Sequence, residues 1–335
     1  MTDTGFHPDT PTLFLTDEDV AALVDEDAAI AALRAAYSRP DEPRRTPERA
    51  VAVTDAGWQR VMPSAPAGGR FAGSKTITAS ISNGLASYLI TLFDQNDSRL
   101  AALIDGNRIT GIRTAATAAA ALTALLPPQP VTAAVVGSGF EARAQLRAAS
   151  RVADITAARV WSPTPKNRER FAADLGADLG IPITATATAE QAVRGADLVL
   201  CAARSRDETP TVRAEWVRDA ATVVSVGSTT PTQHELDPAL IGRAALVVAD
   251  AREEVLNDSG DMIAARHAGI DPDAVTVSLH DLLGGQATRP DEGIAIYKST
   301  GSGFQDIVLA ELLYERALEH GVGTTLPVGI LTIRK

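Results

Sequence analysis

The sequence predicts an α/β protein that combines a doubly wound parallel sheet with a discontinuous α+β domain. Residues 131–136 form an apolar run that ends in a glycine turn, and strands alternate with helices from there to about residue 279. Short β-like segments between residues 47 and 93 precede this region. Alternation of strand and helix is typical of a parallel sheet covered by helices on both faces, whereas clustered short strands are typical of an antiparallel sheet.

The glycine turn lies in the stretch VTAAVVGSGFEARAQL, residues 131–146. We predict a buried parallel strand, a tight turn at Gly137-Ser138-Gly139, and a helix that Ala142 allows to pack closely on the strand. The free N–H groups and the dipole at the start of such a helix bind an anion without a charged side chain. The pattern therefore predicts a Rossmann-type dinucleotide site, against the alternative of an ordinary strand, turn and helix. The turn residues assigned to the cofactor are Gly137, Ser138, Gly139, Phe140, Glu141 and Ala142.

The composition is that of an ordinary globular enzyme, with 45% hydrophobic and 22% charged residues among 335. The net charge of −11 argues against partners such as nucleic acid or an anionic membrane, since both need clustered Lys and Arg. Cys201 is the one cysteine, so we expect no intrachain disulfide, a buried thiol and a cytoplasmic protein. We expect neither a signal peptide nor a membrane span, because no apolar run approaches about 18 residues. The five histidines show no ligand spacing, so we expect no metal.

The N-terminal part is predicted to form a helix and then an antiparallel sheet. Residues 1–12 lack periodicity and are predicted as a loose tail, and Thr16 is the predicted N-cap of one helix that runs to about residue 38. Strands are predicted in the segments RAVAV, WQRVMP, GSKTITA, ASYLITLFD and LAALI. An alanine-rich helix from Asn107 to Leu126 then ends at Pro127-Pro128, which marks a domain boundary.

The chain is thus divided into residues 1–126 with 290–335, which form the substrate-binding and dimerisation domain, and residues 127–289, which form the dinucleotide-binding domain. Strand Ile294-Ala-Ile-Tyr and a helix from Gly303 to His320 are expected to return to the first domain. The segment from Lys298 to Gly303 closes over the nicotinamide or caps this last helix, and the sequence does not separate the two.

The end of the second strand of the dinucleotide-binding domain favours NADP(H), with NAD(H) as the alternative. A carboxylate at this position binds the ribose hydroxyls in NAD sites, and the sequence Trp-Ser-Pro-Thr-Pro-Lys-Asn-Arg has none. Ser162 and Thr164 can donate to a 2′-phosphate, and Lys166 and Arg168 can neutralise it. The alternative interpretation of the same residues is a helix-capping turn followed by solvated basic side chains.

A set of motifs in chain order resembles the ornithine cyclodeaminase/mu-crystallin family, over about residues 13 to 320. The motifs are Gly73-Ser-Lys75, Leu92-Phe-Asp94, Ile109-Thr-Gly-Ile-Arg113-Thr-Ala-Ala, the glycine turn, Val226-Gly-Ser-Thr229-Thr-Pro231 and Glu235-Leu-Asp237. The resemblance implies a homodimer in which the N-terminal sheets pair, with the substrate between that domain and the nicotinamide. It also implies hydride exchange at a carbon that carries nitrogen and a carboxylate, in a small α-imino or α-amino acid.

Three basic residues match the substrate positions of this family: Arg49, Lys75 and Arg113. Arg113 is the preferred carboxylate ligand, because its fork can bind both oxygens. Lys75 lies on an apolar strand, where a buried ammonium needs an anionic partner, and it either binds the substrate or donates a proton. Arg49 competes with Arg44 and Arg45 nearby, and an outward-facing lysine or a solvated arginine is the ordinary alternative for each position.

The loop after strand 222–226 is predicted to lie at the carboxyl edge of the sheet, where open α/β folds bind ligands. We assign Gly227 and Ser228 to the cofactor and Thr229 to catalysis. The position of Thr229 is usually an aspartate in the cyclodeaminases of the family, and threonine is closer to the serine of the mu-crystallin-like ketimine reductases. The acidic residues Glu253, Glu254, Asp258 and Asp261 are expected on a solvated helix face.

The sequence therefore predicts an NAD(P)H-dependent imine reductase or amino-acid dehydrogenase that acts on a C=N bond beside a carboxylate. The alternatives are a cyclodeaminase that keeps bound NAD and releases ammonia, and a non-catalytic protein that binds NADP and a small ligand.

Overall fold

The computed structural model describes residues 11–327, 329–330 and 332, so most of the predicted tail at residues 1–12 lies outside the described residues. The chain forms two units, which we describe separately. Unit 1 comprises the described parts of Met1–Ala36, Glu42–Arg113 and Ser302–Lys335, and unit 2 comprises Tyr37–Asp41 and Thr114–Gly301. These bounds assign residues 37–41, 114–126 and 290–301 to unit 2, whereas the boundaries expected from the sequence place them with the first domain.

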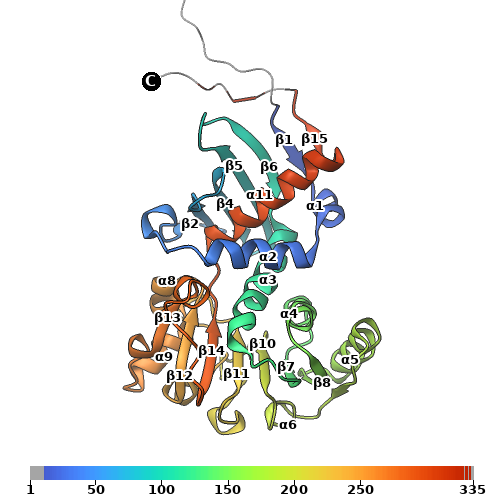
Figure 1. Ribbon diagram of the computed structural model, residues 1–335, viewed down its shortest axis with the longest axis vertical. Coiled ribbons are helices and arrows are strands. Elements are labelled where there is room, and N and C mark those ends of the chain that lie inside the picture. Colours follow the sequence, from blue (N-terminus) through green and yellow to red (C-terminus); the bar gives the residue numbers. More distant parts are fainter. Residues whose placement is uncertain (1–10, 328, 331, 333–335) are drawn as a thin grey trace, which may run out of the picture. The chain divides into compact units, whose positions relative to one another are not determined.

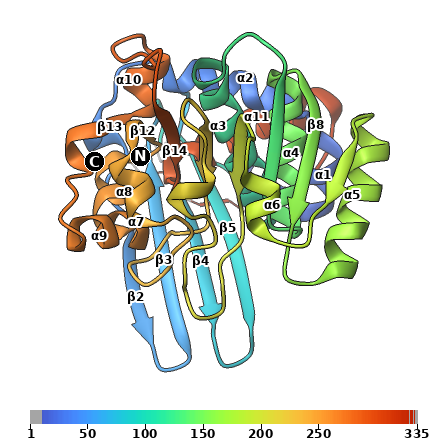
Figure 2. The same cartoon turned by 90° about the horizontal axis from the view of Figure 1, so that it is seen from below.

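The described part of unit 1 is built on a seven-stranded sheet in the order β15-β1-β6-β5-β4-β3-β2 (Figures 1 and 2). Strands β2 to β6 are antiparallel neighbours, as predicted, and the unpredicted β1 pairs parallel with β6. The strands are β1 (Leu13–Leu15), β2 (Ala50–Thr54), β3 (Gly57–Ser64), β4 (Phe71–Ser80), β5 (Leu85–Asp94), β6 (Leu100–Asp105) and β15 (Thr324–Thr325).

The predicted N-terminal helix is two helices, α1 (Asp17–Leu23) and α2 (Glu26–Tyr37). Thr16 caps α1 as predicted, in a capping box with Asp19. The prediction of one continuous helix was wrong because Val24 is extended and the side chain of Asp25 accepts the N–H of Ala28, which starts a second helix. A short 3₁₀ turn, η1 (Pro43–Arg45), leads into β2.

Helix α11 (Gly303–His320) packs on β3, β4 and β5 of unit 1, as Figure 1 shows. Its first turn is fully buried, because the backbone there approaches β3 closely. A side chain at Gly303 would place its Cβ 2.5 Å from the carbonyl oxygen of Met62, so only glycine fits. The alanine-rich helix α3 (Asn107–Leu125) begins in this unit and continues into unit 2.

Unit 2 contains an eight-stranded sheet within residues 131–298, in the order β13-β12-β14-β11-β10-β7-β8-β9. All its pairs are parallel, which confirms the predicted doubly wound sheet. Its strands are β7 (Val131–Val136), β8 (Ile155–Trp161), β9 (Ile183–Ala185), β10 (Leu198–Cys201), β11 (Thr222–Ser225), β12 (Ala244–Ala249), β13 (Thr276–Ser278) and β14 (Ile294–Lys298). Its helices are α4 (Phe140–Val152), α5 (Pro165–Leu179), α6 (Ala189–Val193), α7 (Pro238–Gly242), α8 (Arg252–Asp258), α9 (Gly260–His267) and α10 (Leu279–Leu283), with 3₁₀ turns η2 (Ala214–Trp216) and η3 (Asp273–Val275).

The strand order places the topological switch between β7 and β10, because successive strands run outward from β7 to β8 and β9 and then return to β10. Open α/β sheets bind ligands at such a point, outside the carboxyl ends of the strands. The glycine turn follows β7 directly and therefore lies at this edge.

Strand β14 lies inside the eight-stranded sheet, between β12 and β11. This corrects the expectation that residues 294–297 return to the first domain with the last helix. Every residue of β14 is buried, including Lys298. An interior position explains the apolar run better than an edge position, since both faces and both edges of the strand are covered.

Candidate functional site

The glycine turn after β7 has the geometry of an anion site. Gly137 has φ +125°, and a Cβ there would lie 2.7 Å from the carbonyl oxygen of Ala202, so this position requires glycine. Gly139 is the N-cap of α4 without a side-chain cap, and a Cβ on it would meet no atom within 4 Å. The first turn of α4 therefore presents its N–H groups beside open space, which fits the pyrophosphate of a dinucleotide. Ala142 is fully buried under this turn, as its predicted packing role requires.

The residues predicted to bind the 2′-phosphate lie beside this turn. The hydroxyl of Ser138 donates to the hydroxyl of Ser162 at 2.9 Å, and Arg168 donates to the carbonyl oxygen of Ser162 at 2.8 Å. Thr164 and Lys166 are exposed at the start of α5. The structure thus gathers these four residues at one strand end, and no carboxylate occurs between Trp161 and Arg168.

Unit 1 contains a buried charged cluster centred on Asp306, in the first turn of α11. Lys75 on β4 is fully buried, and its Nζ lies 2.8 Å and 2.7 Å from the two carboxylate oxygens of Asp306. Thr110 accepts a further hydrogen bond from Nζ at 3.3 Å. Burial lowers the pKa of Lys75 to about 8, with Asp306 opposing the shift and Arg113 adding to it. The anionic partner that the sequence required for Lys75 is therefore Asp306.

Arg113 on α3 belongs to the same cluster. Its Nε lies 3.3 Å from Oδ1 of Asp306, and its Nη1 donates to Oε1 of Gln305 at 2.7 Å. The side chain is only 8% exposed, so it is not the solvated arginine of the alternative interpretation. Lys75 and Arg113 share one carboxylate, so the three groups together carry a net positive charge. Two sequence-predicted residues are thus brought together, and sequence reasoning missed the aspartate and the glutamine that hold them.

Arg49 is half-buried and directly precedes β2, which β3 separates from β4 in the sheet order. Its assignment to substrate binding stays a prediction.

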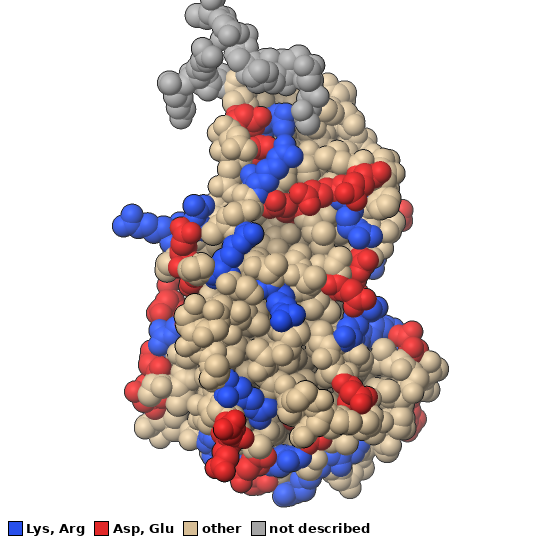
Figure 3. Space-filling view, viewed as in Figure 1, with Lys and Arg blue, Asp and Glu red and all other residues tan. Residues whose placement is uncertain are grey.

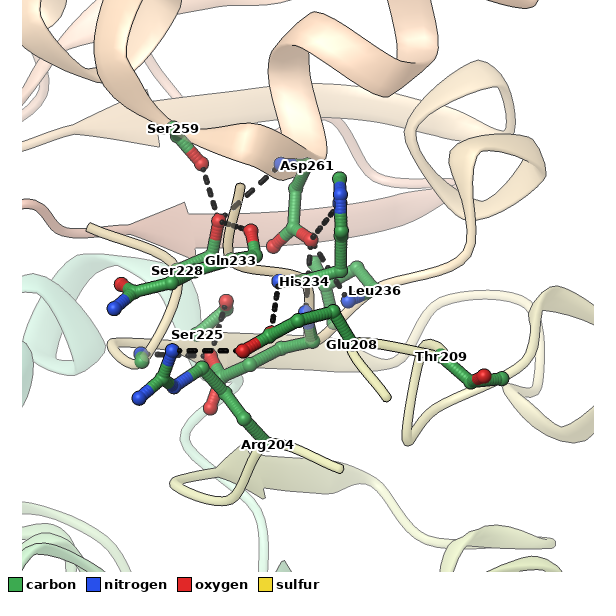
Figure 4. A network of polar contacts seen from close by, with 12 residues as sticks. Arg204, Glu208, Thr209, Ser225, Ser228, Gln233, His234, Leu236, Ser259 and Asp261 are labelled. Carbon is green, nitrogen blue, oxygen red and sulfur yellow. Dashed lines mark hydrogen bonds and ion pairs between the residues drawn. The ribbon is translucent and has the colours of Figure 1, made fainter. Parts of the chain in front are cut away.

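The loop after β11 is held by contacts within it and by contacts with Ser259 and Asp261 (Figure 4). The main-chain N–H and the hydroxyl of Thr229 both donate to Oε1 of Gln233, at 3.0 Å and 3.1 Å. The hydroxyl of Ser228 is buried, donates to the carbonyl oxygen of Gln233 at 2.6 Å and accepts the N–H of Asp261 at 3.2 Å. Ser228 therefore supports the loop with its side chain and can meet a ligand through its main chain.

A buried network under this loop was missed by sequence reasoning. Oε2 of Glu235 accepts hydrogen bonds from the hydroxyl of Ser225 at 2.7 Å and from the N–H of Gly227 at 2.8 Å. Nζ of Lys298 lies 2.9 Å from Asp261 and donates to Ser225 at 2.7 Å. Burial raises the pKa of Glu235 to about 7, against the lowering effect of Lys298.

Asp261 was expected on a solvated helix face, and this was wrong, because its side chain is fully buried. Its Oδ1 accepts the N–H groups of Glu235 and Leu236, at 2.9 Å and 3.1 Å (Figure 4). The lysine at the end of the apolar strand β14 was the available signal, because a buried ammonium needs a buried carboxylate.

The segment after Lys298 is held by Asp250, at the end of β12. The carboxylate of Asp250 accepts from the hydroxyl of Ser299 at 2.6 Å and from the N–H groups of Thr300 and Gly301, at 3.1 Å and 2.9 Å. Ser302 is the N-cap of α11 but makes no side-chain capping bond. These contacts fix residues 299–301 within unit 2, and closure of the segment over a nicotinamide stays a prediction.

The remaining polar groups of the described residues suggest no other centre. No group of three or more His, Cys, Asp or Glu residues suited to a metal ion occurs in the part of the chain that the structure describes. Cys201 is buried, and burial raises the pKa of its thiol. On the face drawn in Figure 3, Lys and Arg are interspersed with Asp and Glu. None of the described helices is long and apolar enough to cross a membrane.

Comparison with known proteins identifies the family of the chain. The model of the ornithine cyclodeaminase/mu-crystallin family matches residues 10–321, and the chain belongs to this family. Ketimine reductase mu-crystallin of Mus musculus is 31% identical over 226 residues, which are 68% of this chain and 68% of that protein.

Two solved structures share the fold over nearly the whole chain. Delta(1)-pyrroline-2-carboxylate reductase of Thermococcus litoralis, in complex with NADH and L-proline, superposes with a TM-score of 0.85 at 29% identity, over 94% of this chain and 100% of that chain. An archaeal alanine dehydrogenase dimer with bound NAD gives a TM-score of 0.85 at 26% identity, over 95% of this chain and 99% of that chain.

Proposed function

We propose that the protein is an NAD(P)H-dependent oxidoreductase that reduces the C=N bond of a small α-imino acid to the α-amino acid, or runs the reverse oxidation. The observation that carries this is the cluster of Lys75, Arg113 and Asp306. Lys75 and Arg113 are both buried cations, and they converge on the carboxylate of Asp306. A buried guanidinium beside a second cation is suited to a substrate carboxylate, which can accept the fork of Arg113.

The glycine turn and the loop after β11 supply the dinucleotide half of the proposal. Gly139 leaves room for the pyrophosphate beside the N–H groups of α4, and Gly227 and Ser228 offer main-chain groups at the same edge of the sheet. The bound dinucleotide supplies the hydride that the imine carbon accepts. The residues of this chain bind and orient the two reactants, which is most of what such a transfer asks of a protein.

Proton handling is the reason to prefer imine reduction to cyclodeamination. An iminium already carries the proton that the amine keeps, so hydride addition to carbon completes the reaction, and a neutral imine needs one proton from water or from Lys75. Cyclodeamination requires a base near nitrogen at several steps. Thr229 carries a hydroxyl that donates to Gln233, and a hydroxyl does not accept a proton at neutral pH.

The decisive experiment follows NADPH absorbance with a panel of cyclic and acyclic α-imino acids, and separately measures ammonia release from L-ornithine. We expect steady NADPH consumption with imines and little or no proline from ornithine. Ammonia release from ornithine with no net change in absorbance would establish a cyclodeaminase instead. Tight dinucleotide binding without turnover of either substrate would establish a non-catalytic binding protein.

We further propose that the enzyme prefers NADP(H), because Ser162, Thr164, Lys166 and Arg168 gather at the end of β8 where an NAD site has a carboxylate. Lys166→Glu should weaken NADPH binding about tenfold and leave NADH binding nearly unchanged, since a phosphate contact is replaced by repulsion. The measurement is kcat/KM for each cofactor. Arg170→Glu, an exposed change on the same helix, is the control, and equal losses for both cofactors would contradict the preference.

We also propose a homodimer. Leu85 and Leu89 are 67% and 40% exposed on one face of the unit 1 sheet, and alternation along β5 places them opposite Ile90, which shares the face of Lys75. An apolar sheet face of this kind is covered by packing against a second sheet. A second copy of this chain is the occupant we infer, since the similar alanine dehydrogenase is a dimer.

A further inference from the structure

A buried carboxylate holds the first residue of the loop that we assign to the cofactor. Oε2 of Glu235 accepts both the N–H of Gly227 and the hydroxyl of Ser225, the last residue of β11. A Cβ on Gly227 would lie 2.4 Å from Oε1 of Glu235, so the carboxylate occupies the space where a side chain would project. The position of Gly227 therefore depends on this side chain, whereas Gln233 holds Ser228 and Thr229.

The charges around Glu235 do not balance. The charge of Lys298 on β14 lowers the pKa of Glu235, and the charge of Asp261 on α9 raises it. Burial and then the charge of Glu235 raise the pKa of the Cys201 thiol on β10. The side chain of His234 lies near Asp261, with its Nδ1 3.9 Å from Oδ1 of that residue. One ammonium thus serves two fully buried carboxylates. Such an arrangement favours a proton on one carboxylate close to neutral pH.

We propose that Glu235 is a positioning residue for the dinucleotide, which holds the start of the loop 227–229 firmly when it is ionised and loosely when it carries a proton. This inference rests on the proposed function. Bonds to an ionised acceptor are about twice as strong as bonds to a neutral one, so the N–H of Gly227 is fixed best by the charged form. Dinucleotide binding should then release a proton from Glu235, and affinity should rise with pH near neutrality.

The same proton has the opposite effect on folding, which separates this role from a merely structural one. The pKa of Glu235 is raised from its usual 4.5 to about 7, so the folded state favours the protonated form. That contribution to stability is present below about pH 4.5 and is lost as the pH rises to about 7. Over the upper part of this range the protein should become less stable while it binds its cofactor more tightly.

The test compares wild type, Glu235→Gln and Asp197→Asn. NADH and NADPH are titrated by fluorescence from about pH 6 to about pH 8, and Tm is recorded at each pH. NADH is the cleaner probe, because it has no 2′-phosphate to titrate. Wild-type affinity should rise about fivefold across this range. Glu235→Gln should bind about fivefold more weakly than wild type at the upper end, with a flat profile, and should lose the fall in Tm.

Asp197 is a matched control, because its Oδ2 also accepts one N–H and one hydroxyl, both from Thr132 at 2.8 Å. It precedes β10 and so lies at the amino edge of the sheet, away from the loop. Asp197→Asn should lower Tm and leave the affinity and its pH profile as in wild type.

Each outcome of these experiments supports or overturns the proposed role of Glu235. A wild-type profile in Glu235→Gln, or the same change in Asp197→Asn, overturns the role of Glu235. If Glu235→Gln does not fold, calorimetry of wild type in buffers of different ionisation enthalpy measures protons released on NADH binding near pH 7, and no release overturns it. If wild type binds neither NADH nor NADPH, the proposed function itself fails, and this is a different result from the others.

Discussion

Arg113→Ala is expected to lower kcat/KM for an α-imino acid about a hundredfold while the Kd for the dinucleotide stays nearly constant. The guanidinium is buried beside Asp306 and Gln305, where a hydrogen bond to a charged group is worth about 3 kcal/mol. The loss should appear mainly in KM if the fork binds substrate and transition state equally. Steady-state kinetics with one imine at saturating NADPH, together with a dinucleotide titration, measures both quantities.

Arg108→Ala is the matched control, because Arg108 lies on the same helix and also pairs with a carboxylate, that of Asp17 at 2.7 Å. This pair is partly exposed, so its removal should change neither kinetics nor Tm by much. Arg113→Lys keeps the charge without the fork and should recover part of the activity. Kinetics of Arg113→Ala that match wild type would remove the residue from the substrate site.

Gly139→Val is expected to weaken dinucleotide binding about a hundredfold or more with little change in Tm. The backbone of Gly139 is extended, at φ −80° and ψ −168°, which valine adopts readily. Its side chain would enter the open space next to the first turn of α4, where we place the pyrophosphate. Fluorescence titration with NADPH and a thermal melt are the two measurements.

Gly137→Ala gives the contrasting result. Its backbone has φ +125°, and an added Cβ would lie 2.7 Å from a main-chain oxygen. The protein should therefore lose stability whether or not the cofactor is bound. A Gly139→Val protein that binds NADPH as wild type does would show that the open space at this helix start is not the cofactor site.

The elements with strong local signals could be predicted from the sequence. The alternation along residues 131–279 gave the parallel sheet, and Thr16 marked a helix start that the structure has. Lys75 inside an apolar strand correctly required a buried anion, because that requirement follows from the cost of burying charge alone.

The missed residues are those whose partners are distant in the sequence. Asp306 meets Lys75 across 231 positions, and only the packing of α11 on β4 brings the two together. Lys298 reaches Asp261 because β14 enters the sheet between two earlier strands. Neither of these two ion pairs has a local signal in the sequence. The helix break at Asp25 had a local signal, because an aspartate stands where it can cap a helix, but the continuous apolar periodicity favoured one helix.

The interior position of β14 also constrains how the polypeptide is made. Strands β11 and β12 both leave the ribosome before β14, and neither is the hydrogen-bonded neighbour of the other in the finished sheet. Until residue 298 has emerged, each therefore presents an open edge, the kind of surface that recruits foreign strands. Lys298 arrives with the same strand, so the charge that compensates Asp261 and the backbone that closes the gap are delivered together. We therefore expect the nascent chain to keep two open strand edges throughout synthesis of the interval between β12 and β14, and slower translation over that interval to prolong their exposure.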